Sequence, residues 1–137
     1  MDARLSIIVY RGDPVDLPRT RHTALFVIFA DNSTVLIHAT GAAGFFSVEQ
    51  RPQAQPRKSQ NFEQDIPVAT IGGKTRAEVQ STIAATPTNN STHDWDCQKW
   101  VGDALTRLSN LGWITGEAES DGISKMVDVL WEAKDEE

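Results

Sequence analysis

The sequence lacks most features of secreted, membrane and nucleic-acid-binding proteins. It contains one cysteine, so no disulfide can form within the chain, and this agrees with a reducing compartment. The opening residues, MDARLSIIVYRGD, hold an apolar run too short for a signal-peptide core, and no stretch approaches membrane-spanning length. The 13 basic residues form no stripe and are outnumbered by 19 acidic ones. We therefore expect a cytoplasmic protein that binds neither nucleic acid nor membrane.

What remains is the composition of an ordinary globular domain. Hydrophobic residues make up 39% of the chain and charged residues 23%. A chain of 137 residues can bury a hydrophobic core without a disulfide. No repeat or linker divides it, so we expect a single domain over residues 1–137.

Hydrophobic patterns in the first half predict strands. LSIIVYRG predicts a first strand, and RHTALFVIFA a second that is apolar on both faces and therefore covered on both sides. DNST predicts a turn, and VLIHATG the returning strand of a hairpin. GFFSVEQR and IPVATIGG favour two further strands. The polar residues 51–65 between them predict a surface loop, and we expect this loop and the GAAGFF stretch to contact substrate.

The second half predicts helices. TRAEVQSTIAAT begins with a Thr-x-x-Glu capping box. Apolar residues then recur at helical spacing from Cys97 onward, and the candidate caps of this helix are Thr92, Asp94 and Asp96. GISKMVDVLWEAK (122–134) predicts a last amphipathic helix. The whole pattern indicates an α+β fold, a small and mostly antiparallel sheet with helices packed on it.

The single cysteine, Cys97, lies at the predicted start of a helix. Backbone N–H groups and the positive end of the helix dipole favour a thiolate there, while the charges of Asp94 and Asp96 oppose it. The N–H groups of residues 97 and 98 can also stabilise the oxyanion of an attacked carbonyl, with Gln98 as a side-chain donor. Cys97 is thus a candidate nucleophile. The alternative is an inert core thiol, since free cysteine is among the most buried residue types.

Two histidines lie on neighbouring strands of the predicted hairpin. His22 begins the strand that is covered on both sides, and His38 lies on the returning strand. A helix that starts with Cys97 and packs on this sheet can bring the thiol to His22, with His38 orienting the first ring. For each histidine the alternative is a structural side chain whose hydrogen bonds are satisfied within the fold.

Three segments, RHTALFVIF, LIHATG and WDCQKWVGDAL, resemble the motifs of circularly permuted papain-like proteins of the NlpC/P60 superfamily. The chain is similar to the lecithin:retinol acyltransferase-like branch, where a histidine opens a strand, a second follows on the next strand and an Asn-Cys motif starts a later helix. The HT pair also resembles the PPPDE isopeptidases. The resemblance covers residues 20–112 and implies a permuted papain-like fold with Cys97 as nucleophile, His22 as base and His38 as third residue.

The chain departs from the acyltransferase pattern at several positions. Asp96 stands where those proteins usually have Asn, and Lys99-Trp100 replaces His-Phe. Thr20 and Arg21 stand where an aromatic residue often precedes the first histidine. These differences leave the oxyanion hole undefined.

Other candidate residues have simpler interpretations. His93 lies four positions before Cys97, but the paired spacings of zinc sites are absent, so we expect no metal. Trp95 is a candidate substrate contact, although such a tryptophan more often packs a helix start. Gly41 is a candidate for close approach of backbone to the site. IGGKT is not a phosphate-binding loop, because Val68 stands where that motif needs glycine.

Together these patterns predict a thiol-dependent hydrolase or acyltransferase that needs no cofactor and acts on an amide, ester or thioester. Its substrate would be a small molecule or a peptide, and His22 would take the proton from Cys97 before attack. Two alternatives stay open. One is a non-catalytic small-molecule or protein-binding domain with the same fold. The other is an isomerase or cyclase of a small metabolite, in which the same residues transfer protons.

Overall fold

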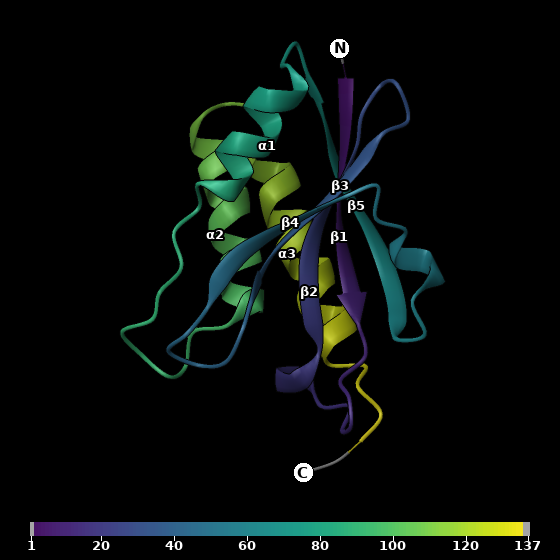
Figure 1. Ribbon diagram of the computed structural model, residues 1–137, viewed down its shortest axis with the longest axis vertical. Helices are drawn as coiled ribbons and strands as arrows, with labels where there is room; N and C mark the ends of the chain where they lie inside the picture. Colours follow the sequence, from purple (N-terminus) through teal and green to yellow (C-terminus); the bar gives the residue numbers. More distant parts are fainter. Residues whose placement is uncertain (1, 136–137) are drawn as a thin grey trace.

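A computed structural model describes residues 2–135, which form one antiparallel sheet with helices on one side (Figure 1). The sheet has five strands in the order β4-β3-β2-β1-β5, and each neighbouring pair is antiparallel. Their bounds are β1 Asp2–Tyr10, β2 His22–Ile28, β3 Thr34–Thr40, β4 Ser47–Pro52 and β5 Phe62–Gly72. Two short 3-10 helices, η1 Pro18–Thr20 and η2 Pro56–Lys58, lie in the connections.

Three α-helices follow the last strand and cover a single face of the sheet. They are α1 Arg76–Ala84, α2 Cys97–Asn110 and α3 Gly116–Leu130. Helix α2 packs against β2 and β3, α3 against β1 and β5, and α1 against β3 and β4. The predicted α+β fold is therefore confirmed, with an antiparallel sheet and packed helices.

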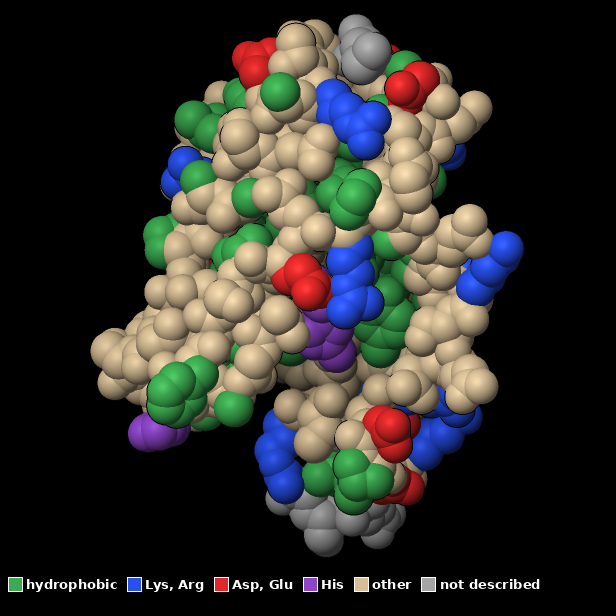
Figure 2. Space-filling model, viewed as in Figure 1, with side chains coloured by type: hydrophobic (Ala, Val, Ile, Leu, Met, Phe, Trp, Pro, Cys, Tyr) green, Lys and Arg blue, Asp and Glu red, His purple; other side chains and the backbone are tan. Residues whose placement is uncertain are grey.

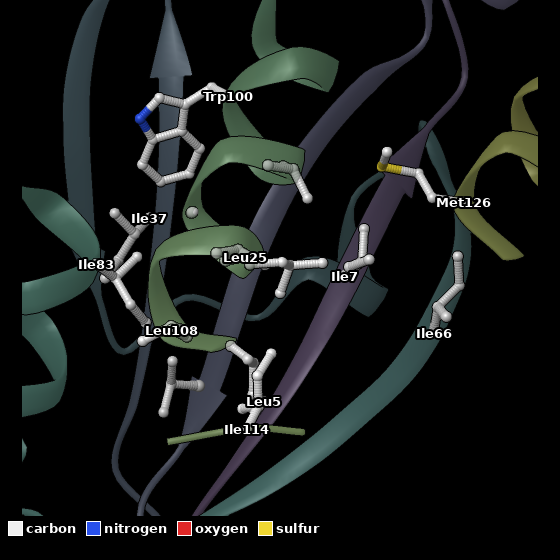
Figure 3. Packing of buried hydrophobic residues seen from close by; sticks show 14 of the residues in the cluster. Leu5, Ile7, Leu25, Ile37, Ile66, Ile83, Trp100, Leu108, Ile114 and Met126 are labelled. Carbon is white, nitrogen blue, oxygen red and sulfur yellow. The ribbon is translucent and has the colours of Figure 1, made fainter. Parts of the chain in front are cut away.

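The main hydrophobic core fills the space between the sheet and these helices. Figure 3 shows strand and helix side chains pointing toward one another in this layer. The labelled members, all buried, are Leu5, Ile7, Leu25, Ile37, Ile66, Ile83, Trp100, Leu108, Ile114 and Met126. Complete burial of a side chain of this size contributes about 1.5–3 kcal/mol.

A second, smaller apolar cluster lies on the opposite face of the sheet. It consists of Ile8, Ala24, Phe26 and Leu36, with Tyr10, Ala54 and Phe62 packed around it. The predicted coverage of the second strand on both sides is thus confirmed, since Ala24 and Phe26 are buried on one face and Leu25 and Val27 on the other. On this second face, the cover comes from the segment between β4 and β5, with Ala54 and Phe62, and not from an α-helix.

Most predicted elements agree with the structure, apart from two boundaries. The capping box of α1 forms as expected: Thr75 accepts a hydrogen bond from the N–H of Glu78, whose carboxylate accepts one from the N–H of Thr75. Helix α3 begins at Gly116 instead of Gly122, because the Thr115 side chain accepts a hydrogen bond from a first-turn N–H. The predicted loop over residues 51–65 is shorter, since β5 starts at Phe62.

Candidate functional site

Strand alternation decides which side chains reach which face of the sheet. Successive residues of a strand point to opposite faces. Leu25 and Val27 belong to the core under the helices, whereas Ala24 and Phe26 belong to the opposite cluster. His22 therefore lies on the face opposite the helices. It stacks on Tyr10, a member of that cluster, with ring centroids 5.9 Å apart and an interplanar angle of 29°.

The two strand histidines are in direct contact. Nε2 of His22 lies 2.6 Å from Nδ1 of His38, and the two rings meet edge to face with centroids 4.8 Å apart. His38 is buried, with 6% of its surface exposed. His38 therefore lies beside His22 as expected, and its role in orienting the His22 ring stays a prediction.

Strand β4 adds a carboxylate and a guanidinium to this pair. Glu49 is directly opposite His38 in the antiparallel register, and its Oε1 lies 2.7 Å from Nε2 of His38. Nε of Arg51, two residues along the same face, donates to that carboxylate oxygen at 2.6 Å. Figure 2 looks onto this face and shows a histidine side chain at its middle beside acidic and basic ones.

The hydrogen bonds assign a direction to this chain of groups. A carboxylate only accepts, so Nε2 of His38 donates its proton to Glu49. In a neutral ring Nδ1 of His38 then accepts, and Nε2 of His22 donates to it. Nδ1 of His22 is left with its lone pair. That nitrogen is not among the buried unpartnered polar atoms of the described residues, where only Oγ1 of Thr86 is found, so solvent reaches it.

The surroundings of His22 keep its ring neutral. The pKa of His22 is lowered to about 4, mainly by burial and to a smaller extent by electrostatic repulsion from His38 and Arg51. The carboxylate of Glu49 acts in the opposite direction but less strongly. At neutral pH His22 is therefore an uncharged imidazole that can accept a proton or a hydrogen bond at Nδ1.

A cavity of about 980 Å³ lies over the histidine pair. Both histidines and Tyr10 form part of its wall, and residues 52–61 form another part. The predicted substrate-contacting loop therefore borders the cavity, whereas GAAGFF does not. The charged residues of the lining are Arg11, Asp13, Arg51 and Lys58.

Cys97 lies on the other side of the sheet, so its predicted contact with His22 is wrong. Its carbonyl accepts a hydrogen bond from Oγ1 of Thr23 at 3.1 Å, and Thr23 points to the helix-covered face. The thiol is buried, and burial raises its pKa. The charge of Asp96 also raises the pKa. Hydrogen bonds from Thr23 lower the pKa, but by less than burial raises it. These features are those of the inert core thiol.

The predicted oxyanion site at the start of α2 is occupied by the protein itself. Asp96 is the N-cap residue, and its Oδ1 accepts hydrogen bonds from the N–H groups of Gln98 and Lys99 at 3.0 and 3.1 Å. The Gln98 side chain donates to the carbonyls of Pro18 and Arg21. Neither group of Gln98 is free to bind an oxyanion, so this assignment is wrong.

Trp95 and Gly41 have structural roles and do not line the cavity over His22. Trp95 is buried against Phe46, and its Nε1 donates to Asp103 at 3.3 Å. Gly41 has φ of +127°, and an added Cβ would come within 2.6 Å of the Phe45 carbonyl oxygen, so the turn after β3 requires glycine. Their assignment as substrate contacts stays a prediction.

His93 lies exposed in the loop before α2, away from the other two histidines. Over residues 2–135, no group of three His, Cys, Asp or Glu side chains is placed to hold a metal ion. Within the same residues, no helix has the length and apolar character needed to cross a membrane.

The sequence interpretation missed Tyr10, Glu49 and Arg51 as members of the site. Two signals pointed to them. The strand around SVEQR places Glu49 and Arg51 two residues apart, hence on one face. The hairpin pairing then brings Glu49 opposite His38.

Comparison with known proteins yields one family. Searches of curated proteins and of solved structures found no match to the chain. Residues 7–115, most of the chain, match the model of a family described as one of unknown function, DUF6540. The chain therefore belongs to the DUF6540 family.

Proposed function

We propose that the protein acts on a small molecule by proton transfer, with His22 as the general base. The observation that carries this proposal is the hydrogen-bonded chain from Glu49 through His38 to His22, which ends at the cavity. Buried and hydrogen-bonded to Glu49, His38 fixes the tautomer of His22. Tyr10 stacks on the same ring and limits its rotation.

In such a reaction a proton passes only between the ligand and His22. Nδ1 of His22 accepts a proton from an acidified carbon, oxygen or nitrogen of the ligand and becomes an imidazolium. Glu49 stabilises this cation through His38. The imidazolium then returns the proton to another atom of the ligand. Isomerisation and cyclisation of a small metabolite are the reaction classes that this cycle fits.

A low pKa supports a second candidate function. A general base works best when its pKa lies near the working pH. Burial holds the pKa of His22 at about 4, well below that optimum. A neutral imidazole with a fixed tautomer is also a good hydrogen-bond acceptor for a ligand. A non-catalytic small-molecule-binding domain is therefore the runner-up, and it uses the same cavity.

The thiol-dependent hydrolase or acyltransferase receives no support from the geometry. Its mechanism needs the sulfur of Cys97 within hydrogen-bonding reach of His22. Cys97 instead contacts Thr23 on the helix-covered face of the sheet, whereas His22 lines the cavity on the opposite face. The resemblance to permuted papain-like proteins stays a prediction.

Nitrogen-15 NMR of histidine-labelled protein tests the proposal. The chemical shifts of the two ring nitrogens report which one carries the proton. We expect Nε2 of His22 protonated and Nδ1 bare at neutral pH. In His38→Ala the acceptor is gone, so His22 should show a mixture of tautomers. His93→Ala, which alters an exposed histidine, is the matched control and should leave the His22 signals unchanged.

The opposite tautomer of His22 in the unaltered protein would overturn the proposal, because its lone pair would then face His38 and not the cavity. A neutral His22 with the expected tautomer but no ligand turnover would favour the binding domain. Deuterium incorporation into a bound ligand in heavy water, lost in His22→Gln, would favour the enzyme.

A further inference from the structure

The charged groups around the His22 cavity have the sign opposite to that of the whole protein. The chain carries a formal net charge of −6. The cavity lining nevertheless holds three cationic side chains, Arg11, Arg51 and Lys58, against one carboxylate, that of Asp13. A concave site lined by one sign of charge concentrates ligands of the opposite sign.

These cations come from different parts of the chain. Arg11 follows β1, and its Nη2 donates to the carbonyl of Gln60 across the cavity wall. Arg51 lies on β4, and its ion pair with Glu49 holds its guanidinium beside the histidines. Lys58 ends η2 on the bordering loop. The fold thus brings Arg11, which follows β1, to the same cavity as two cations from β4 and the loop after it.

The charge of Arg51 influences the pKa values of two groups in the site. It lowers the pKa of His22, although burial is the larger cause. It also acts to lower the pKa of Tyr10, against a larger rise caused by burial. A guanidinium this close to both rings can hold one end of a ligand while another part meets Nδ1 of His22.

We propose that this cavity binds a small molecule through an oxyanion group, either carboxylate or phosphate, held by Arg11, Arg51 and Lys58. The proposal rests on the proposed function, because it uses the same cavity and places the reacting part of the ligand against His22. Guanidinium groups match the planar, two-oxygen geometry of carboxylates and phosphates. Lysine supplies an additional mobile charge.

Anion binding has a signature at His22 that a neutral ligand does not produce. A negative charge near an imidazole favours its charged form and raises its pKa. The charged or titratable groups around His22 are Tyr10 from β1, His38 from β3, and Glu49 and Arg51 from β4, together with Arg11, Asp13 and Lys58 on the wall of the cavity. A bound oxyanion adds to the effect of Glu49 and offsets that of Arg51.

The test is an NMR titration of the full chain at constant ionic strength. Histidine ring signals are followed against pH with trifluoroacetate, inorganic phosphate or trifluoroacetamide at millimolar concentration, because both anions keep their charge at the pH where His22 titrates. We expect trifluoroacetate or phosphate to raise the pKa of His22 saturably, and trifluoroacetamide, the uncharged analogue of trifluoroacetate, to leave it unchanged. A response to phosphate alone, or to trifluoroacetate alone, supports the proposal and identifies the group that is bound.

Variants that remove a positive charge show which side chains bind the anion. Lys58→Gln and Arg11→Gln alter exposed side chains, and each should weaken binding of the active anion by about three- to tenfold. Lys125→Gln, an exposed cation on α3, is the matched control and should change nothing. An effect of Lys125→Gln equal to that of Lys58→Gln would overturn the proposal, since binding would then follow net charge.

The titration separates this inference from the function on which it rests. No response of His22 to either anion, or an equal response to trifluoroacetamide, would overturn the oxyanion site while the tautomer measurement still upheld proton transfer. The wrong tautomer of His22 in the free protein would overturn proton transfer, whatever the anions do.

Discussion

The chemistry of the candidate site depends on opposing influences at a single imidazole. Burial, His38 and Arg51 all lower the pKa of His22, and Glu49 raises it. Because the carboxylate and the guanidinium are themselves paired, the site balances two charges that lie two residues apart on one strand.

Removing each of these two charges should shift the pKa of His22 in opposite directions. In Arg51→Gln the repulsion that disfavours the imidazolium is lost, so the pKa of His22 should rise above its value of about 4. In Glu49→Gln the attraction is lost, so the pKa should fall. Ring-proton or nitrogen-15 shifts followed from low pH upward measure both. Shifts of the same sign in the two variants would contradict the arrangement described here.

The buried thiol leads to a second prediction at this scale. Burial raises the pKa of Cys97, so iodoacetamide should label the folded protein slowly at neutral pH and much faster in urea. His22→Ala should leave the rate unchanged, because the ring lies on the other face of the sheet. A labelling rate that falls in His22→Ala would instead show that the thiol and the imidazole interact. Cys97→Ser provides the unlabelled control.

The histidine pair was predictable from the hairpin, but the side on which it lies was not deduced. Residues 24–28 are apolar on both faces, so the sequence of this strand does not show which face the helices cover. The neighbouring strand β3 indicates which face this is. In β3, Val35, Ile37 and Ala39 are uniformly apolar, while His38 and Thr40 alternate with them. The polar residues at these alternate positions lie on the face away from the helices, and His22 lies on the same face.

At the scale of single elements, helix α2 shows how a cap and an oxyanion hole compete for the same N–H groups. Sequence reasoning treated the helix start as an open anion site and also named Asp96 as a cap. The two roles exclude each other, since the Asp96 carboxylate accepts hydrogen bonds from the N–H groups of Gln98 and Lys99. A nearby acidic cap residue is therefore evidence against catalysis at a helix start.

Removing this cap should destabilise the protein and do little else. Asp96→Ala leaves two N–H groups of α2 without a partner, and we expect a loss of about 1 kcal/mol in the free energy of unfolding. Asp96→Asn keeps the cap and should cost less. Urea denaturation of both variants measures the difference. Equal stability of Asp96→Ala and the unaltered chain would contradict a capping role.

Boundaries of elements were less predictable than their presence. The capping box gave the start of α1 because both partners are local in sequence. The start of α3 was missed because two glycines, Gly116 and Gly122, weaken the helical pattern over its first turns. Gly122 is buried and packs against Val68, with an added Cβ only 3.3 Å from Cγ2. Tertiary packing, which sequence patterns do not contain, explains this glycine.

At the scale of the whole molecule, a buried ion pair joins the loop before β2 to the C-terminal segment. Arg21, 1% exposed, donates from Nε and Nη2 to the two carboxylate oxygens of Asp16 at 2.9 Å, and from Nη1 to the Val129 carbonyl at the end of α3. Asp16 in turn accepts from the N–H of Lys134, and its own N–H donates to Asp135. The loop before β2 and the C-terminal segment are thus fixed to each other beside the His22 strand.

Breaking this pair should destabilise the fold far more than breaking a surface pair. Arg21→Met leaves the buried carboxylate of Asp16 without its partner, and we expect a loss of about 3–5 kcal/mol in the free energy of unfolding. Arg57→Met is the matched control: Arg57 pairs with Asp65 at 3.1 Å but is largely exposed, so about 0–1 kcal/mol is expected. Urea denaturation at neutral pH compares the two.

The pH dependence of stability gives an independent check on the same pair. The Arg21 guanidinium holds the pKa of Asp16 well below its usual range, so the unfolded chain binds this proton more readily than the folded one. The stabilisation is therefore complete above the unfolded pKa of about 3.9 and is lost as the pH falls below it. Asp16→Asn should flatten that acid limb of the stability curve. An unchanged slope in Asp16→Asn, or equal losses in Arg21→Met and Arg57→Met, would show that the pair does not anchor the C-terminal segment to the loop before β2.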